Sequence, residues 1–334
     1  MIINLVCYII IIFLINLFIS KSNFLKSHSG FMHQKFLNNS IPLTGGIFIL
    51  LPIFLLFYNF YPYMIMSFFL LFLLGLFSDL NILAKAKYRF LIQFIIISMF
   101  VIFTQLEVLP SRIEYIDNKF QNTFYSYFFT VFCLMVLING SNFIDGLNGL
   151  FLGYNIIILL VLINLDLLGL VGISNESFYI LLSILSFLLL LNFSNKLFMG
   201  DGGAYSLSFL LGYILITIYN KNQIVSPYFI IVLLWYPCFE NLFSILRKFL
   251  INKNPMKPDN SHLHHYLYML IKKKLGLNNL LSNNLSSLMI NSFNLFIFYF
   301  ASLNLNHTQI QLIILFLSII TYLIIFFTLK KILS

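Results

Sequence analysis

Two short polar segments separate long apolar runs in this sequence, and they carry residue types that could do chemistry. The first segment, at 139–149, contains Asn139, Asn142, Asp145 and Asn148 among three glycines. Residues three apart lie on one face of a helix, so the first three of these side chains are expected in one line. A polar turn between two apolar helices is costly beside a membrane unless it binds something. An ordinary polar loop is the alternative interpretation.

The second segment places Asp201 among Gly200, Gly202 and Gly203, directly before an apolar run. Glycine lets the backbone approach a ligand closely and adopt a positive φ. A carboxylate at the start of a helix beside such a turn suits a metal ion that itself holds phosphate. A helix N-cap without any ligand is the alternative.

Other ionisable groups stand at the ends of further apolar runs. Asp79 ends one run and Arg89 begins the next. The alternative interpretation is that Asp79 only caps its helix and that Arg89 only anchors the next helix at the membrane surface. A polar segment then carries His262, His264 and His265. No cysteine is near them in the sequence and oxygen ligands dominate the other segments, so the histidines suit an anion better than a metal.

The composition identifies the class of protein that holds these residues. Of 334 residues, 60% are hydrophobic and only 9% are charged, whereas soluble domains carry about 25% charged residues. The sequence therefore predicts one all-α, polytopic membrane domain over 1–334. A span needs about 20 apolar residues. Eleven candidates lie near 2–20, 45–61, 62–78, 88–106, 124–140, 150–166, 177–194, 204–219, 223–245, 285–303 and 308–329.

The cations predict the orientation of these spans. With the N-terminus outside, the inner connections and the cytoplasmic C-terminus hold sixteen of the 19 Lys and Arg residues, as the positive-inside rule requires. The net charge of +9 is then explained by the membrane topology, and no soluble basic domain is present to bind nucleic acid.

The three cysteines fall inside apolar runs and predict neither disulfides nor a metal cluster. The first run is long enough to span, so no cleavable signal is expected.

Five sequence motifs together resemble the polyprenyl-phosphate N-acetylhexosamine-1-phosphate transferases (glycosyltransferase family 4), and most closely their bacterial undecaprenyl-phosphate GlcNAc-1-phosphate members. All five lie on the predicted cytoplasmic face, between about 40 and 266, in the family's order. They are Pro42-x-x-Gly45-Gly46, Gly75-x-x-x-Asp79, Asn139-x-x-Asn142-x-x-Asp145-Gly146-x-Asn148-Gly149, Phe198-Met199-Gly200-Asp201 and Asp259-x-x-His262-x-His264-His265.

The resemblance implies a role for each matching residue. Asp201 would coordinate Mg²⁺, for which Mn²⁺ could substitute, and Asn142 would be a second ligand. Asp79 and Asp145 are the catalytic candidates: Asp79 beside the attacking lipid phosphate, and Asp145 holding the nucleotide. The implied substrate-binding residues are Phe198 against the uracil, Asn139 and Asn148 in the central motif, and Arg89, His262, His264 and His265 at the phosphates.

The implied reaction is attack by undecaprenyl phosphate on a UDP-HexNAc, releasing UMP. It would be the first membrane step of cell-envelope polysaccharide or O-antigen synthesis, at the cytoplasmic face of a bacterial inner membrane. The resemblance also raises a homodimer as an expectation. Such phosphoryl transfer needs charge neutralisation and in-line positioning of two anions more than covalent help.

Two positions depart from the family pattern. Ser78 stands where the family usually has the first acid of an Asp-Asp pair, which is often proposed as a general base. The second pKa of a phosphate monoester is about 6, so a lipid phosphate is mostly dianionic at neutral pH and needs no base. We expect Asp79 to act electrostatically or through a water. Asn148 stands where many bacterial members have Asp, as in eukaryotic relatives.

Two other functions compete with the transferase. A lipid-linked-sugar transporter would also have many spans, but it predicts polar residues inside the spans and on both faces. A catalytically inactive scaffold homologue would explain Ser78. The sequence does not specify which HexNAc is transferred.

Overall fold

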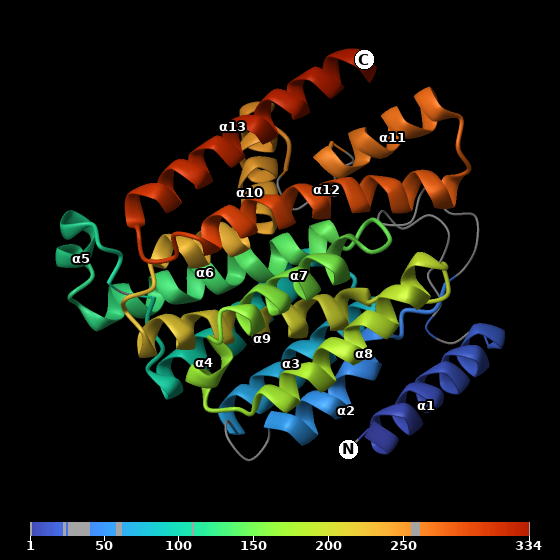
Figure 1. Cartoon of the computed structure of the whole chain (residues 1–334), viewed down its shortest axis with the longest axis horizontal. Coiled ribbons are helices and arrows are strands. Elements are labelled where there is room, and N and C mark those ends of the chain that lie inside the picture. The colour runs from blue at the N-terminus through green and yellow to red at the C-terminus, as the bar shows by residue number, and fades with distance from the viewer. Residues whose placement is uncertain are drawn as a thin grey trace.

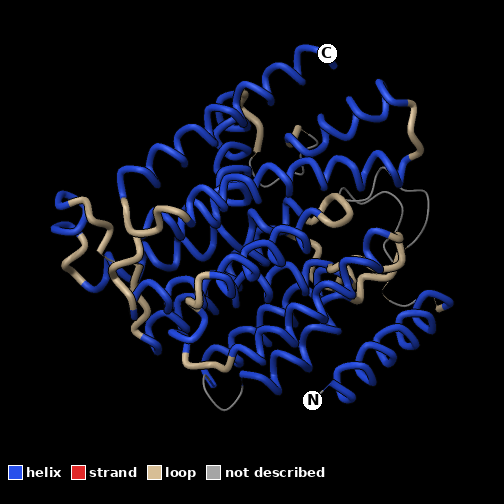
Figure 2. Tube along the Cα trace, viewed as in Figure 1, coloured by secondary structure: helices blue, strands red, loops and turns tan. Residues whose placement is uncertain are grey.

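The computed structural model describes residues 2–22, 25, 41–57, 62–108, 110–254 and 261–333, and this part of the chain is helical without a β-strand (Figures 1 and 2). The all-α prediction is confirmed. The α-helices are α1 (Ile2–Lys21), α2 (Gly45–Phe57), α3 (Pro62–Asp79), α4 (Ala86–Thr104), α5 (Glu114–Lys119), α6 (Thr123–Ile144), α7 (Leu150–Asn164), α8 (Asn175–Phe193), α9 (Gly200–Lys221), α10 (Pro227–Leu250), α11 (Leu263–Leu275), α12 (Asn279–Ser302) and α13 (Thr308–Leu333), and a 3-10 helix lies at Leu168–Val171.

An apolar helix occupies each of the eleven predicted positions. Within the described ranges, nine of these helices are long and apolar enough to cross a membrane, so the chain is a multi-pass membrane protein. The other two, α2 and α7, have 13 and 15 residues. The count of eleven spans and the orientation of the termini stay predictions. Two helices fall outside the predicted spans: α5 in the expected outer loop, and α11 after the histidine-rich start.

Helix α9 forms the centre of the bundle, because its whole apolar window is buried. It packs chiefly against α3, α6 and α2, and Figure 1 shows it running through the middle of the bundle. Small residues permit this packing: an added Cβ on Gly46 would meet the backbone of Gly203, and one on Gly75 would meet that of Gly202. Close backbone approach at small residues is the usual way in which membrane helices pack tightly.

Hydrogen bonds gather several loops at the end of the bundle near α5. The Arg112 guanidinium donates to the carbonyls of Ile224 and Val225 and to the hydroxyl of Thr308. The backbone N–H of Ser226 donates to Leu305 O at 2.9 Å. These contacts join the three connections 105–122, 222–226 and 303–307. All three connections lie at predicted outer loops.

The candidate site residues lie at the other ends of the same helices. The carboxyl end of α3 and the amino end of α9 meet there, and the turn between α6 and α7 contacts the amino-terminal part of α12. The bundle therefore brings the central sequence motifs to one end, which is the arrangement that the loop alternation predicts.

Candidate active site

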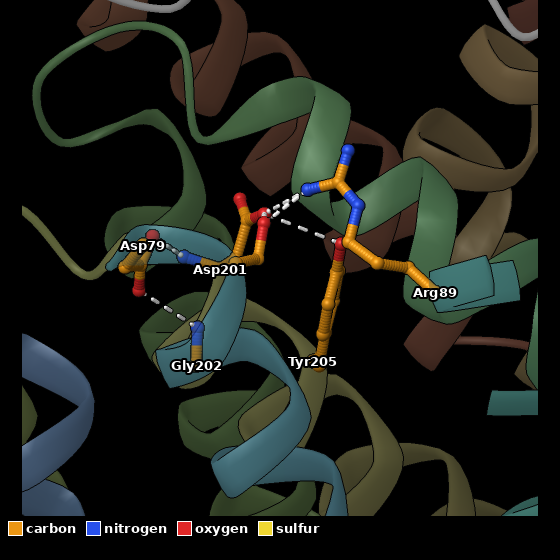
Figure 3. Close-up of polar contacts among 6 residues, drawn as sticks. Asp79, Arg89, Asp201, Gly202 and Tyr205 are labelled. Carbon is orange, nitrogen blue, oxygen red and sulfur yellow. Dashed lines mark hydrogen bonds and ion pairs between the residues drawn. The ribbon is translucent and has the colours of Figure 1, made fainter. Parts of the chain in front are cut away.

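The amino end of α9 is capped by carboxylates from two other parts of the chain. Asp79, the last residue of α3, accepts the backbone N–H of Asp201 on Oδ1 at 3.0 Å and that of Gly202 on Oδ2 at 3.2 Å (Figure 3). Asp145, directly after α6, accepts the N–H of Gly200. The first N–H groups of a helix have no partner within it, and its amino end attracts negative charge. Asp79 and Asp145 therefore fix where α9 begins.

Gly200 is required by this capping. Its φ is +71°, and an added Cβ would lie 2.6 Å from Asp79 Oδ2. A side chain at this position would therefore be strained and would also push the capping carboxylate away. The neighbouring glycines serve helix packing, since Gly202 faces the backbone of Phe72 and Gly203 that of Gly46.

Within the described part of the chain, the hydrogen bonds to the Asp201 side chain all reach one oxygen. Its Oδ2 accepts from Ser78 Oγ at 2.6 Å, from Arg89 Nη1 at 2.7 Å and from the Tyr205 hydroxyl at 3.4 Å. Arg89 also donates to Ser78 Oγ, so Ser78, Arg89 and Asp201 form one cluster. Figure 3 shows Arg89 and Tyr205 reaching the Asp201 side chain. No hydrogen bond from a described residue reaches Asp201 Oδ1. The carboxylate is thus oriented and keeps one oxygen for a ligand.

Three carboxylates approach one another around the start of α9. Burial raises the pKa of Asp145 well above its usual value, the negative charges of Asp201 and Asp79 raise it further, and the Gly200 N–H partly offsets both effects. A divalent cation would relieve this repulsion. In the described ranges, no group of three His, Cys, Asp or Glu side chains could hold a metal ion. The carboxylate oxygen of Asp201 is the type of ligand that Mg²⁺ on phosphates prefers, so the residues present fit such an ion with phosphate oxygens among its other ligands.

Helix α6 extends to Ile144, four residues beyond the predicted end of this span. Asn139 stays helical because its amide donates to Met135 O at 2.9 Å and to Gln93 Oε1 at 3.1 Å. Asn142 is half-buried, and its amide makes no hydrogen bond in the described structure. Asn139, Asn142 and Asp145 thus continue along one face, as predicted, but Asn139 is engaged with α4 while Asn142 keeps its amide oxygen for a ligand.

Asn148 has a different setting from the one expected of a substrate contact. It is fully buried, its backbone N–H donates to Asn283 Oδ1 at 2.7 Å, and its amide donates to Asn195. The turn at 145–149 is therefore anchored to α12 and to the connection before α9. Sequence reasoning missed Asn283; the only signal was a polar side chain near the start of an apolar run.

Phe198 is buried beside the first predicted motif. Its ring packs with Ile41 and Leu43, and its backbone N–H donates to Pro42 O at 2.9 Å. Gly45 N–H then donates to Phe198 O at 3.0 Å. The structure therefore joins the Pro42 and Phe198 motifs, but it encloses the ring predicted to lie against uracil.

The histidine motif begins α11 and lies next to the end of α6. The His262 and His264 rings stack with centroids 5.4 Å apart, the His264 and His265 rings are 4.4 Å apart, and His262 is 5.4 Å from the Phe143 ring. Phe143 directly follows Asn142, so two of the predicted motifs meet here. Asp259, the first residue of this motif, lies outside the described residues.

These elements define a membrane-embedded helical bundle with an acid-rich centre at one end. The profile of glycosyl transferase family 4 matches residues 61–219 of the chain, which include Asp79, Asp145 and Asp201. This match covers a little under half of the chain, and it supports the resemblance drawn from the sequence motifs.

Named relatives agree with the family match. A probable undecaprenyl-phosphate N-acetylglucosaminyl 1-phosphate transferase of Bacillus subtilis is 32% identical over 202 residues, covering 60% of this chain and 56% of the relative. The undecaprenyl-phosphate alpha-N-acetylglucosaminyl 1-phosphate transferases of Escherichia coli and Thermotoga maritima are each 26% identical over 75% of this chain, covering 68% and 75% of the relatives. The chain thus matches little more than half the length of the Bacillus relative.

Proposed function

We propose that this protein transfers a HexNAc-1-phosphate from a UDP-sugar to undecaprenyl phosphate and releases UMP. The observation that carries the proposal is the side chain of Asp201, which is fixed through Oδ2 and open at Oδ1, on the end of the bundle where the family motifs meet. The relatives named above support the lipid acceptor and the sugar class.

The proposed cofactor is Mg²⁺, with Mn²⁺ as a substitute. Asp201 and Asn142 would hold it through Asp201 Oδ1 and the Asn142 amide oxygen, because neither oxygen accepts a hydrogen bond from a described residue. When bound, the ion would neutralise charge on the diphosphate of the sugar nucleotide. Arg89 adds a positive charge beside Asp201, where it is 24% exposed and so accessible to a phosphate oxygen.

In the proposed reaction, a phosphate oxygen of the lipid attacks the sugar-linked phosphorus of the UDP-sugar. A new P–O bond forms there, and the bond to the bridging oxygen breaks, so that UMP leaves with the electron pair. The attacking dianion has no proton to lose at neutral pH. This agrees with the contacts of Ser78 and Asp79, whose side chains orient Asp201 and α9.

We propose that Asp79 and Asp145 act mainly by holding the start of α9. Both Asp79 oxygens accept backbone N–H groups, which leaves this carboxylate poorly disposed to remove a proton. Asn139 would support the site through Gln93, and Asn148 through the turn before α7. Phe198 would contact uracil only if its buried ring moved away from Ile41 and Leu43.

We further propose a bacterial cell-membrane location, with the N-terminus outside and the site open to the cytoplasm, because cations dominate the predicted inner loops. A homodimer stays a prediction that mass photometry in detergent would test. The product would serve cell-envelope polysaccharide or O-antigen synthesis.

Purified protein in detergent with undecaprenyl phosphate and Mg²⁺ tests the proposed reaction directly. UDP-GlcNAc is the first donor to assay because the relatives carry N-acetylglucosaminyl in their names. UMP release together with a lipid diphosphate-sugar supports the proposal. Absence of UMP release from UDP-GlcNAc, UDP-GalNAc and other UDP-HexNAc donors would favour the inactive scaffold, and movement of a lipid-linked sugar without UMP would favour transport.

A further inference from the structure

Glu240 is a fully buried acid within α10, on the third turn before this helix ends. Its surroundings are otherwise rich in aromatic rings, including Trp235, Phe239 and Tyr322. A carboxylate buried in this way is destabilising unless it is paired and hydrogen-bonded. An ionisable group inside a membrane helix therefore indicates a functional role.

Three donors from two other helical segments satisfy this carboxylate. The Oε1 atom lies 2.8 Å from His262 Nδ1 and accepts the backbone N–H of Leu263 at 3.4 Å. The Oε2 atom accepts the hydroxyl of Tyr322, on α13, at 2.6 Å. One acid thus ties the start of α11 and the last long helix of the described chain to α10.

The pairing determines which nitrogen of His262 is free for a ligand. A carboxylate accepts hydrogen bonds, so this contact assigns the proton to Nδ1 and leaves Nε2 as the nitrogen for a substrate. In the doubly protonated ring, Nε2 donates to a phosphate oxygen. The ring plane is also fixed, because it stacks on His264 with an interplanar angle of 11°.

Glu240 also anchors the other two histidines. His262 is the N-cap of α11 but gives no side-chain cap, and Glu240 accepts the N–H of Leu263 instead. His264 and His265 lie in the first turn that follows and are buried. The orientation of the whole histidine motif therefore depends on an acid from a different helix.

We propose that Glu240 is a positioning residue that sets the tautomer and the ring orientation of His262 toward the substrate phosphates, and that Tyr322 holds Glu240 for this task. This inference rests on the proposed transferase function. It adds α10 and α13 to the site, although neither residue belongs to the five motifs.

A double-mutant cycle tests whether Glu240 acts through His262. Glu240→Gln keeps the side-chain size and removes the charge, and we expect kcat/KM for UMP release to fall about ten- to a hundred-fold. In a His262→Asn background, the same change should lower kcat/KM by less than about twofold, because the group that Glu240 orients is gone. Equal losses in both backgrounds would overturn the proposal, since Glu240 would then act independently of His262.

The ring nitrogens of His262 give a readout that needs no turnover. We expect the ¹⁵N spectrum of histidine-labelled protein, assigned with His262→Asn, to show His262 Nδ1 protonated. Glu240→Gln should shift this resonance toward the unprotonated position, since a glutamine amide can present either its oxygen or its NH₂ group to Nδ1. An unchanged resonance would contradict the proposal. Wild-type protein without any UMP release would instead reject the transferase function, and this spectrum would still test the Glu240–His262 pair.

Two further variants complete the experiment. Tyr322→Phe removes only the contact to Oε2 and should reduce kcat/KM about two- to fivefold, again only when His262 is present. This variant keeps the proposal falsifiable if Glu240→Gln fails to fold: a loss that persists in the His262→Asn background would overturn the proposal. Glu114→Gln, in the exposed α5, is the matched control for loss of an acid and should leave both readouts unchanged.

Discussion

The carboxylate of Asp79 accepts the backbone N–H of Asp201 at 3.0 Å, across 122 residues of sequence. The acid that ends α3 therefore sets the position of the acid that begins α9. Because the second oxygen of Asp79 accepts Gly202 N–H, the whole carboxylate is used in capping. This relationship separates two roles among neighbouring acids: Asp79 positions, and Asp201 has an oxygen for a ligand.

Asp79→Asn tests the capping role. The amide can accept only one of the two N–H groups and turns its NH₂ toward the other, so we expect a stability loss of about 1 kcal/mol, as for other N-caps. UMP release should fall as well, because Asp201 moves with the start of α9. Thermal unfolding in detergent and the transfer assay measure the two effects.

Asp117→Asn is the matched control for Asp79→Asn. Asp117 accepts the backbone N–H of Ser111 at 2.6 Å, at the end of the bundle near α5. We expect a comparable loss of stability without a loss of turnover. Full turnover in Asp79→Asn would remove Asp79 from the site.

Gly200→Ala should damage both folding and activity, because Gly200 combines a positive φ with a close approach to Asp79. Gly276 has a similar φ of +61°, but an added Cβ there would meet nothing within 4 Å. Gly276→Ala thus measures the backbone cost alone, about 1 kcal/mol. We expect a larger fall in thermal stability for Gly200→Ala, together with lost UMP release. Equal behaviour of the two variants would argue against the Asp79 contact.

Ser78→Ala tests whether this position needs an acid–base group. Asp201 Oδ2 would lose one of its three donors but keep Arg89 and Tyr205. A hydrogen bond to a charged carboxylate is worth about 1.5–3 kcal/mol, so kcat should fall by about ten- to a hundredfold. Steady-state UMP release measures this change. A loss of about a thousandfold would instead show that the Ser78 hydroxyl takes a direct part in the chemistry.

Much of the bundle was predictable, because apolar runs of nearly 20 residues leave few alternatives to membrane helices. The end of α6 was misplaced because Asn139 and Gly140 are typical of a turn. In the structure, Asn139 satisfies its amide on Met135 and Gln93, and an added Cβ on Gly140 would meet the backbone of Pro237. Tertiary packing therefore keeps these residues helical.

The site residues were predictable as a set, but the separate role of each residue was not. Sequence spacing relates side chains within one helix, whereas the contacts of Asp79 with α9 and of Asn148 with Asn283 join distant segments. Glu240 was visible as an acid near the inner end of a span. Its pairing with His262 depends on how α10 and α11 pack and leaves no local pattern.

Asp201→Asn provides the most direct test of the account. The amide keeps the size of the side chain and an oxygen for Arg89, so the thermal midpoint should stay near that of the wild type. Loss of a metal contact costs several kcal/mol, and Mg²⁺-dependent UMP release should fall by about a thousandfold. Mg²⁺ with UDP-GlcNAc should also cease to raise the thermal midpoint. Wild-type turnover by Asp201→Asn at the same Mg²⁺ concentration would contradict the central claim that Asp201 holds the ion.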